Sequence, residues 1–75
     1  MDLLEIREKL DVVDREIVRL FEERMRLCGQ VAEFKIETGK PVFDAEREKQ
    51  KLAAARAMAH GEFNEQAVTE LFPSL

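Results

Sequence analysis

A heptad repeat runs in one register through the first half of the chain, with apolar residues at all but one of its a and d positions from Leu3 to Phe34. Apolar side chains recur at alternating spacings of three and four residues, which is typical of the a and d positions of a coiled-coil helix. These residues, called here the heptad stripe, are Leu3, Ile6, Leu10, Val13, Ile17, Leu20, Leu27, Val31 and Phe34. The stripe predicts a single helix from Leu3 to about Glu37, roughly 50 Å long at 1.5 Å per residue.

A helix of this length exceeds what a compact chain of 75 residues needs. A chain of this size cannot bury a large core alone, and Cys28 is its only cysteine, so no disulfide framework can compensate. We predict that Cys28 packs as a small apolar residue in a reduced, cytoplasmic protein. The remaining source of stability is association with another chain, and a two-fold homodimer is the commonest form.

The second half of the chain predicts two shorter helices. Thr38–Pro41 contains the Gly and Pro that end a helix, and Asp44 is a typical N-cap. We expect the second helix to continue to about Ala59, and the third to start at an Asn64 N-cap and to be interrupted at Pro73. The inward stripe expected on the second helix is Ala45, Glu48, Leu52, Ala55 and Ala59. No strand pattern is present, so the sequence predicts one all-α domain over residues 1–75.

Composition narrows the classes of function. The formal net charge of −4, with acidic and basic residues interleaved, disfavours nucleic acid as the main partner. No signal peptide or membrane-spanning apolar run is visible. His60 is the only histidine, and no phosphate-binding glycine loop or nucleophilic triad is present. We therefore expect no metal site, and chemistry based on positioning and electrostatics.

One position of the heptad repeat carries a cation instead of an apolar residue. Arg24 occupies an a position between Leu20 and Leu27. Polar residues at such positions can set the register of a coiled coil, and this is one interpretation of Arg24. The other is an anion site, because Lys35 follows eleven residues later, about 20° around the helix and roughly 16 Å along it. Two long side chains leaning across that gap leave room for one small molecule.

Arg7 borders the same stripe at an e position but lies about 25 Å from Arg24 along the helix. An antiparallel partner helix would remove this separation. If two copies cross near residue 20, Arg7 of one chain lies level with residue 33 of the other, inside the gap between Arg24 and Lys35. Arg7 as an exposed surface residue is the alternative interpretation.

The start of the second helix adds a further cluster. Asp44, Arg47 and Glu48 are spaced i, i+3, i+4 and share one face. Asp44 can act as a helix cap, and Arg47 as the ion-pair partner of an acidic neighbour. Glu48 belongs to the expected inward stripe, where a buried carboxylate requires a cation or a ligand hydroxyl as partner.

Several motifs together resemble the all-helical chorismate mutases. They are Ile6–Lys9, Asp14, Glu23–Arg24, Val31–Lys35, Pro41–Val42 and Asp44–Glu48, within a similarity that extends from Leu3 to about Phe72. The resemblance includes free mutases and modules fused to prephenate dehydratase. It implies an intertwined antiparallel homodimer with two active sites, without a cofactor, that converts chorismate to prephenate in phenylalanine and tyrosine biosynthesis.

The resemblance also implies roles for the candidate residues. Arg24 and the Arg7 of the opposite chain would bind the two carboxylates of chorismate, and Lys35 would contact a carboxylate and the ether oxygen. Arg47 would add positive potential and a carboxylate contact. The remaining two residues, Asp44 and Glu48, would hold the ring hydroxyl.

The chain departs from the family pattern at its third helix, which in the family continues for several turns past the position of Leu75. Those turns supply polar residues to the site, so we expect a domain truncated within its third helix: either a fragment of a longer chain or a shortened protein with impaired activity. A non-catalytic helical module that dimerises or regulates, and that binds an aromatic-pathway ligand without turnover, is the second hypothesis. A lyase acting on isochorismate is a third, which no feature of the sequence selects.

Overall fold

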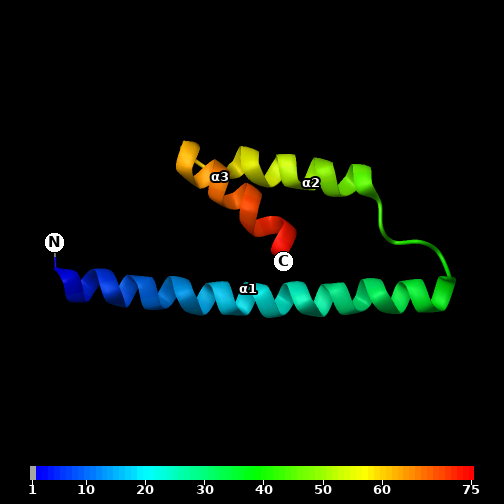
Figure 1. Ribbon diagram of the computed structural model, residues 1–75. Coiled ribbons are helices and arrows are strands. Elements are labelled where there is room, and N and C mark those ends of the chain that lie inside the picture. The colour runs from blue at the N-terminus through cyan, green and yellow to red at the C-terminus, as the bar shows by residue number, and fades with distance from the viewer. Residues whose placement is uncertain (1) are drawn as a thin grey trace. The chain divides into compact units, whose positions relative to one another are not determined.

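The fold is known from a computed structural model that describes residues 2–75. Along these residues lie three α-helices, a short 3-10 helix and no strand (Figure 1). The elements are α1 (Leu3–Thr38), α2 (Ala45–Met58), α3 (Glu62–Leu71) and the 3-10 helix η1 (Phe72–Ser74). The all-α class predicted from the sequence is confirmed. No helix of residues 2–75 has the length and apolar character needed to cross a bilayer.

Local signals define both ends of α1. At its start the Asp2 carboxylate accepts a hydrogen bond from the backbone N–H of Leu4 at 3.1 Å, which satisfies one of the free N–H groups of the first turn. At its end Gly39 adopts a left-handed conformation (φ 68°), and its N–H donates to the carbonyl of Lys35 at 2.8 Å. A glycine adopts this conformation without the steric penalty of a Cβ. The predicted helix and its stop signal are confirmed.

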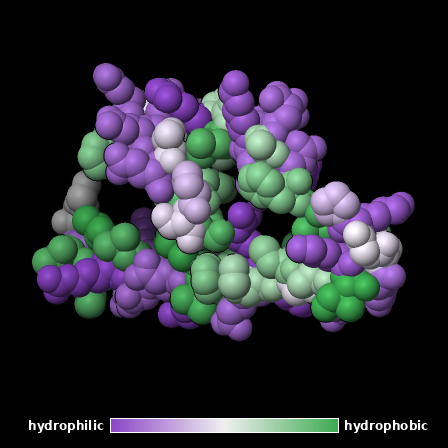
Figure 2. Space-filling model, turned by 45° about the vertical axis from the view of Figure 1, so that its right-hand side comes forward, coloured by the Kyte–Doolittle hydropathy of each residue, from purple (hydrophilic) through white to green (hydrophobic). Residues whose placement is uncertain are grey.

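The chain divides into two compact units, Met1–Val42 and Phe43–Leu75. In the first unit α1 is a single continuous helix with no buried residue. The side chains of the heptad stripe are 46–58% exposed, apart from the half-buried Ile6. Figure 2 shows apolar side chains reaching the surface along α1. The stripe therefore has no cover within its own unit.

In the second unit α2 packs against α3, and η1 contacts both helices. Ala55 of α2 is the single buried residue among residues 2–75, with 5% of its surface exposed. Four further apolar residues of this unit are half-buried: Leu52 of α2, Ala59 at its C-cap, Val68 of α3 and Phe72 of η1. The small side chains on this face of α2 allow the close approach that a short helical hairpin requires. The C-terminal part of the predicted inward stripe is thus confirmed.

The predicted start of the third helix is wrong. We expected Asn64 as its N-cap, whereas α3 begins at Glu62 after Gly61, whose φ of 91° lets the chain turn sharply out of α2. Glu62 and Glu65 then lie in the first turn, where the helix dipole favours acidic side chains. The amide of Asn64 donates to the carbonyl of His60 at 3.0 Å, so it stabilises the turn.

Candidate active site

Arg24 stands on α1 with an unusually isolated guanidinium group. Its Nε atom is shielded from solvent and has no hydrogen-bond partner within residues 2–75. The positions three and four residues away are Leu20, Phe21, Leu27 and Cys28, none of which can accept a strong hydrogen bond from a cation. A shielded, unsatisfied donor on a charged group is costly unless a partner supplies an acceptor. Arg24 is therefore a candidate to bind an acceptor from outside its helix.

Lys35 is isolated in the same way. It is exposed on the last turn of α1, and its neighbours at i±3 and i±4 are Val31, Ala32, Thr38 and Gly39. In the part of the chain that the structure describes, its ammonium group makes no ion pair. The position near the C-terminal end of the helix also favours a cation through the helix dipole. Helical geometry separates it from Arg24 by about 16 Å along the axis on nearly the same face.

The opposite face of α1 shows how cations behave when acidic neighbours are present. Arg19 forms an ion pair with Glu16 at 2.9 Å, and Arg26 forms one with Glu23. The hydrogen bond from Arg19 and its charge lower the pKa of Glu16. These ion pairs stabilise the helix at pH values above the ordinary pKa of a carboxyl group. Their contribution is lost as the pH falls through the lowered pKa. Both arginines, unlike Arg24, are neutralised locally.

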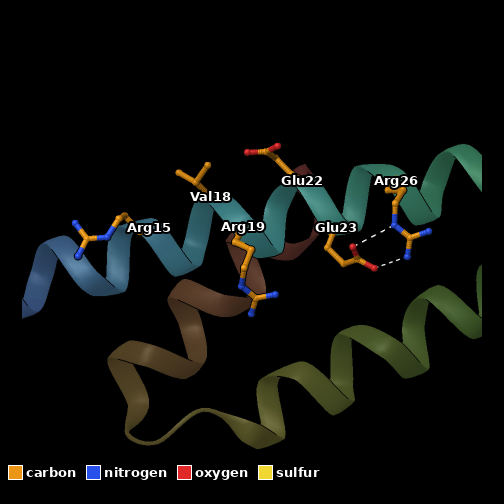
Figure 3. A pocket seen from close by; sticks show the side chains of 6 residues that line it. All are labelled: Arg15, Val18, Arg19, Glu22, Glu23 and Arg26. Atoms are coloured by element: carbon orange, nitrogen blue, oxygen red, sulfur yellow. Dashed lines mark hydrogen bonds and ion pairs between the residues drawn. The ribbon is translucent and has the colours of Figure 1, made fainter.

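These paired residues border an open pocket on that face of α1. Figure 3 shows its lining residues, with the Glu23–Arg26 pair marked by dashed lines. They are Arg15, Val18, Arg19, Glu22, Glu23 and Arg26. Arg15 precedes Arg24 by nine residues, which corresponds to about 180° around an ideal helix. The pocket therefore lies away from the heptad stripe and includes none of the candidate site residues.

Arg7 lies in the first turns of α1, exposed and without an ion pair among residues 2–75. Asp11 is its only acidic neighbour at i±3 or i±4, and the two side chains are not in contact as an ion pair. About 25 Å of helix separates Arg7 from Arg24. On one chain, Arg7 cannot share a small ligand with Arg24.

Asp44 is the N-cap of α2, as predicted. Its Oδ1 accepts hydrogen bonds from the backbone N–H groups of Glu46 at 3.0 Å and Arg47 at 3.2 Å. The carboxylate is thereby engaged in capping, and it does not neutralise the guanidinium of Arg47. Arg47 is exposed, and no ion pair of Arg47 occurs in the described part of the chain.

The predicted burial of Glu48 is wrong for the single chain. Glu48 and Ala45 are exposed, because the buried face of α2 is confined to the region around Leu52, Ala55 and Ala59. Glu48 nevertheless lies one turn after Asp44, and its backbone N–H donates to the carbonyl of Asp44 at 3.0 Å. Cys28, expected to be packed, is likewise a free and exposed thiol.

The structure thus groups the candidate residues in two sets, one in each unit. The first set lies on α1: Arg7, Arg24 and Lys35, of which the last two share a face. The second set lies at the start of α2: Asp44 at its N-cap, with Arg47 and Glu48 in its first turns. The sequence analysis did not explain why Arg24 and Lys35 form no ion pair within α1. The reason is visible in the sequence, because neither Arg24 nor Lys35 has an acidic residue at i±3 or i±4. No cluster of three potential metal ligands occurs among residues 2–75.

The helix cap at Asp44 leads to a stability prediction. Asp44→Ala removes the acceptor for two backbone N–H groups, so we expect the free energy of unfolding to fall by about 1 kcal/mol. Urea denaturation followed by circular dichroism measures this change at a fixed chain concentration. Asp11→Ala is the matched control, because Asp11 is an exposed acidic residue within α1 without a capping role. Equal stabilities of the two variants would contradict the capping assignment.

Comparison with known proteins decides the family. Residues 6–75 match the model of the family described as chorismate mutase type II. The chain belongs to the chorismate mutase type II family. The resemblance inferred from the motifs is therefore confirmed, and all six candidate site residues lie inside the matched region.

Curated relatives of this chain agree with the family assignment. A chorismate mutase of Methanocaldococcus jannaschii is 49% identical over 47 residues, which cover 63% of the chain and 48% of the relative. The T-protein of Haemophilus influenzae is 39% identical over 57 residues, 76% of the chain and 15% of that protein. A bifunctional chorismate mutase/prephenate dehydratase of Aquifex aeolicus is 37% identical over 49 residues, 65% of the chain and 14% of the relative.

The matched segment spans about half the length of the first of these relatives and a smaller part of the others. No solved structure gives a significant match to the chain.

Proposed function

We propose that the chain is a chorismate mutase that rearranges chorismate to prephenate. The observation that carries this proposal is the pair of unneutralised cations, Arg24 and Lys35, on one face of α1 in a chain of the type II family. Chorismate is a dianion, and its two carboxylates and ether oxygen are hydrogen-bond acceptors. A site built from guanidinium and ammonium donors, without a nucleophile, suits a substrate of this kind.

The reaction needs only binding and electrostatics. The ether C–O bond breaks while a new C–C bond forms within the same molecule, and no proton or group passes to the protein. Holding the flexible dianion in its compact reactive conformer can lower the barrier by several kcal/mol. A donor fixed beside the ether oxygen stabilises the negative charge that develops there as the C–O bond breaks. We assign this second task to Lys35.

The other residues divide between the carboxylates and the ring hydroxyl. Arg24 binds one carboxylate, and Arg7 of a second copy binds the other. Arg47 adds a cation from the first turn of α2. Asp44, through its backbone, and Glu48 hold the hydroxyl; the exposed position of Glu48 leaves its carboxylate free for this contact.

The site is completed in this proposal by a homodimer. The heptad stripe is half exposed on each copy, and covering such side chains stabilises association by on the order of 1 kcal/mol each. An antiparallel crossing near residue 20 covers the stripe and brings Arg7 of one copy level with the gap between Arg24 and Lys35 of the other. A two-fold axis then generates two equivalent sites. The free thiol of Cys28 fits a reducing, cytoplasmic location, which stays a prediction.

A continuous ultraviolet assay of chorismate loss tests the proposed activity. We expect turnover by the chain that is absent from a double variant, Arg24→Ala with Lys35→Ala. The matched control is Arg15→Ala with Arg19→Ala, which removes two cations from the opposite face of α1. Binding of chorismate without turnover would favour the non-catalytic module instead. Equal rates for both double variants would overturn the assignment of the site.

A further inference from the structure

Thr38, the last residue of α1, makes two hydrogen bonds through its hydroxyl group. The hydroxyl donates to the backbone carbonyl of Phe34 at 2.7 Å. It also accepts a hydrogen bond from the backbone N–H of Lys40 at 3.2 Å. All three residues belong to the first unit, Met1–Val42. The side chain of Thr38 therefore joins the last turn of α1 to the segment that follows it.

The bond from Lys40 distinguishes Thr38 from an ordinary helical threonine. Serine and threonine hydroxyls within helices often donate to the carbonyl four residues before them. Thr69 of α3 donates in this way to the carbonyl of Glu65 at 2.8 Å, and its hydroxyl accepts no hydrogen bond in the described part of the chain. Thr38 makes the same bond and in addition serves as an acceptor. The two threonines therefore form a natural pair for comparison.

The acceptor role of Thr38 satisfies a group that the helix end leaves without a partner. α1 ends at the left-handed Gly39, whose N–H donates to the carbonyl of Lys35 at 2.8 Å. An ending of this type uses one backbone hydrogen bond, so the N–H of the next residue, Lys40, has no helical acceptor. The hydroxyl of Thr38 supplies one. Thr38 and Gly39 thus close the last turn of α1 together.

Lys35 lies in the turn that these bonds close. Its own carbonyl accepts the bond from Gly39, and the carbonyl of Phe34, the residue before it, accepts the bond from Thr38. Helix ends without such bonds open locally at little cost in free energy. Opening of this turn would displace the Cα atom of Lys35, and the ammonium group would move with it. Closure of the turn therefore fixes the backbone from which the Lys35 side chain extends.

We propose that Thr38 is a positioning residue for Lys35. This inference rests on the proposed function, in which the ammonium group of Lys35 stabilises the charge that develops on the ether oxygen. Stabilisation of this kind requires a donor that is held in place before the reaction. A displacement of about 1 Å can cost about 10² in rate, so the backbone of Lys35 has to stay closed. Thr38 acts through Lys35 and contacts no reacting atom.

Thr38→Val tests this role, because valine keeps the branched shape of threonine and removes both hydrogen bonds. We expect kcat for chorismate to fall by about three- to tenfold and KM to change by less than about twofold, since the contact at the ether oxygen strengthens in the transition state. Thr38→Ser keeps the hydroxyl and should retain the kcat of the parent chain. Thr69→Val, the control, makes the same exchange in α3 and should leave kcat unchanged. Equal kcat values for the two valine variants would overturn the proposal.

A double-mutant cycle separates positioning from a general loss of stability. A residue that acts only through Lys35 has nothing left to position once the ammonium group is removed. Thr38→Val should therefore lower kcat in the parent chain and cause no further fall when it is added to Lys35→Ala. A purely structural role of Thr38 would lower kcat by the same factor in both backgrounds, and that result would contradict the proposal.

Amide hydrogen exchange followed by NMR measures the closure of the turn without the reaction. We expect Thr38→Val to speed exchange of the Gly39 and Lys40 amides by about three- to tenfold, and Thr69→Val to leave both rates unchanged. Unchanged exchange in Thr38→Val would show that its hydroxyl does not hold the turn, and would overturn the proposal.

The kinetic and exchange measurements also separate this proposal from the proposed function. Turnover by the parent chain, with a normal kcat in Thr38→Val, removes the positioning role and leaves the enzyme assignment. A parent chain without turnover instead overturns the proposed function, and with it the role of Lys35 at the ether oxygen.

Discussion

Replacing Lys35 with Ala is expected to lower kcat for chorismate by about 10²–10³ while the chain still forms its dimer. The factor is typical of removing one preorganised donor from a developing oxyanion. Because the charge on the ether oxygen develops in the transition state, the loss should be larger in kcat than in KM. Steady-state kinetics by ultraviolet absorbance measures kcat and KM. Sedimentation velocity of the same variant measures whether it still forms the dimer.

Two comparisons make the Lys35 prediction specific. Arg15→Ala removes a cation from the opposite face of the same helix and should leave kcat unchanged. Lys35→Gln retains a hydrogen-bond donor without the charge, so it should recover part of the lost rate. A Lys35→Ala variant with near-normal turnover, or one that raises only KM, would contradict the role at the ether oxygen.

Arg7→Ala is the second substitution with a large expected effect. Truncating one member of a desolvated charge pair commonly costs about 2–5 kcal/mol, so we expect kcat/KM to fall by at least about 30-fold. Arg7 binds a carboxylate that is charged in both the ground state and the transition state, so the change should be mainly in KM. Lys9→Ala, two residues away on a different side of α1, is the control and should have a small effect. Equal effects of the two substitutions would indicate that Arg7 is a surface residue.

The helices themselves were predictable because their signals are local. The period of three and four from Leu3 to Phe34 defines α1, and the left-handed Gly39 ends it within one residue of the predicted position. The N-cap at Asp44 was predicted correctly for the same reason, since a carboxylate reaches only the backbone of its own helix start. These features depend on a few neighbouring residues and not on the rest of the molecule.

The errors occurred where local signals compete or where packing decides. Asn64 is a good N-cap residue, but Gly61 permits the chain to turn earlier, and α3 starts at Glu62. Glu48 follows the spacing of the inward stripe, yet the packing between α2 and α3 is centred on Ala55 and leaves the first turn of α2 exposed. Periodicity indicates which residues share a face, but it does not indicate how far a neighbouring helix covers that face.

The candidate site was predictable as a set of residues and not as an assembled pocket. Arg24 and Lys35 stand out by spacing alone, and the structure adds that the Nε of Arg24 lacks a partner. The heptad stripe identifies a surface for association without identifying the chain that covers it. The assignment of Arg7 to the opposite copy therefore stays a prediction, and it is the central claim of the proposed function.

Mixing two impaired variants, with chorismate well below KM, tests that claim most directly. In a dimer of one Arg7→Ala chain and one Lys35→Ala chain, one site lacks both side chains, and the other combines Lys35 of the first chain with Arg7 of the second. If chains exchange freely between dimers, half of the dimers are mixed, and each mixed dimer has one intact site of two. About a quarter of the parent activity should therefore return. If the mixture shows only the average of the two separate variants, Arg7 does not act across the dimer and the shared-site account is wrong.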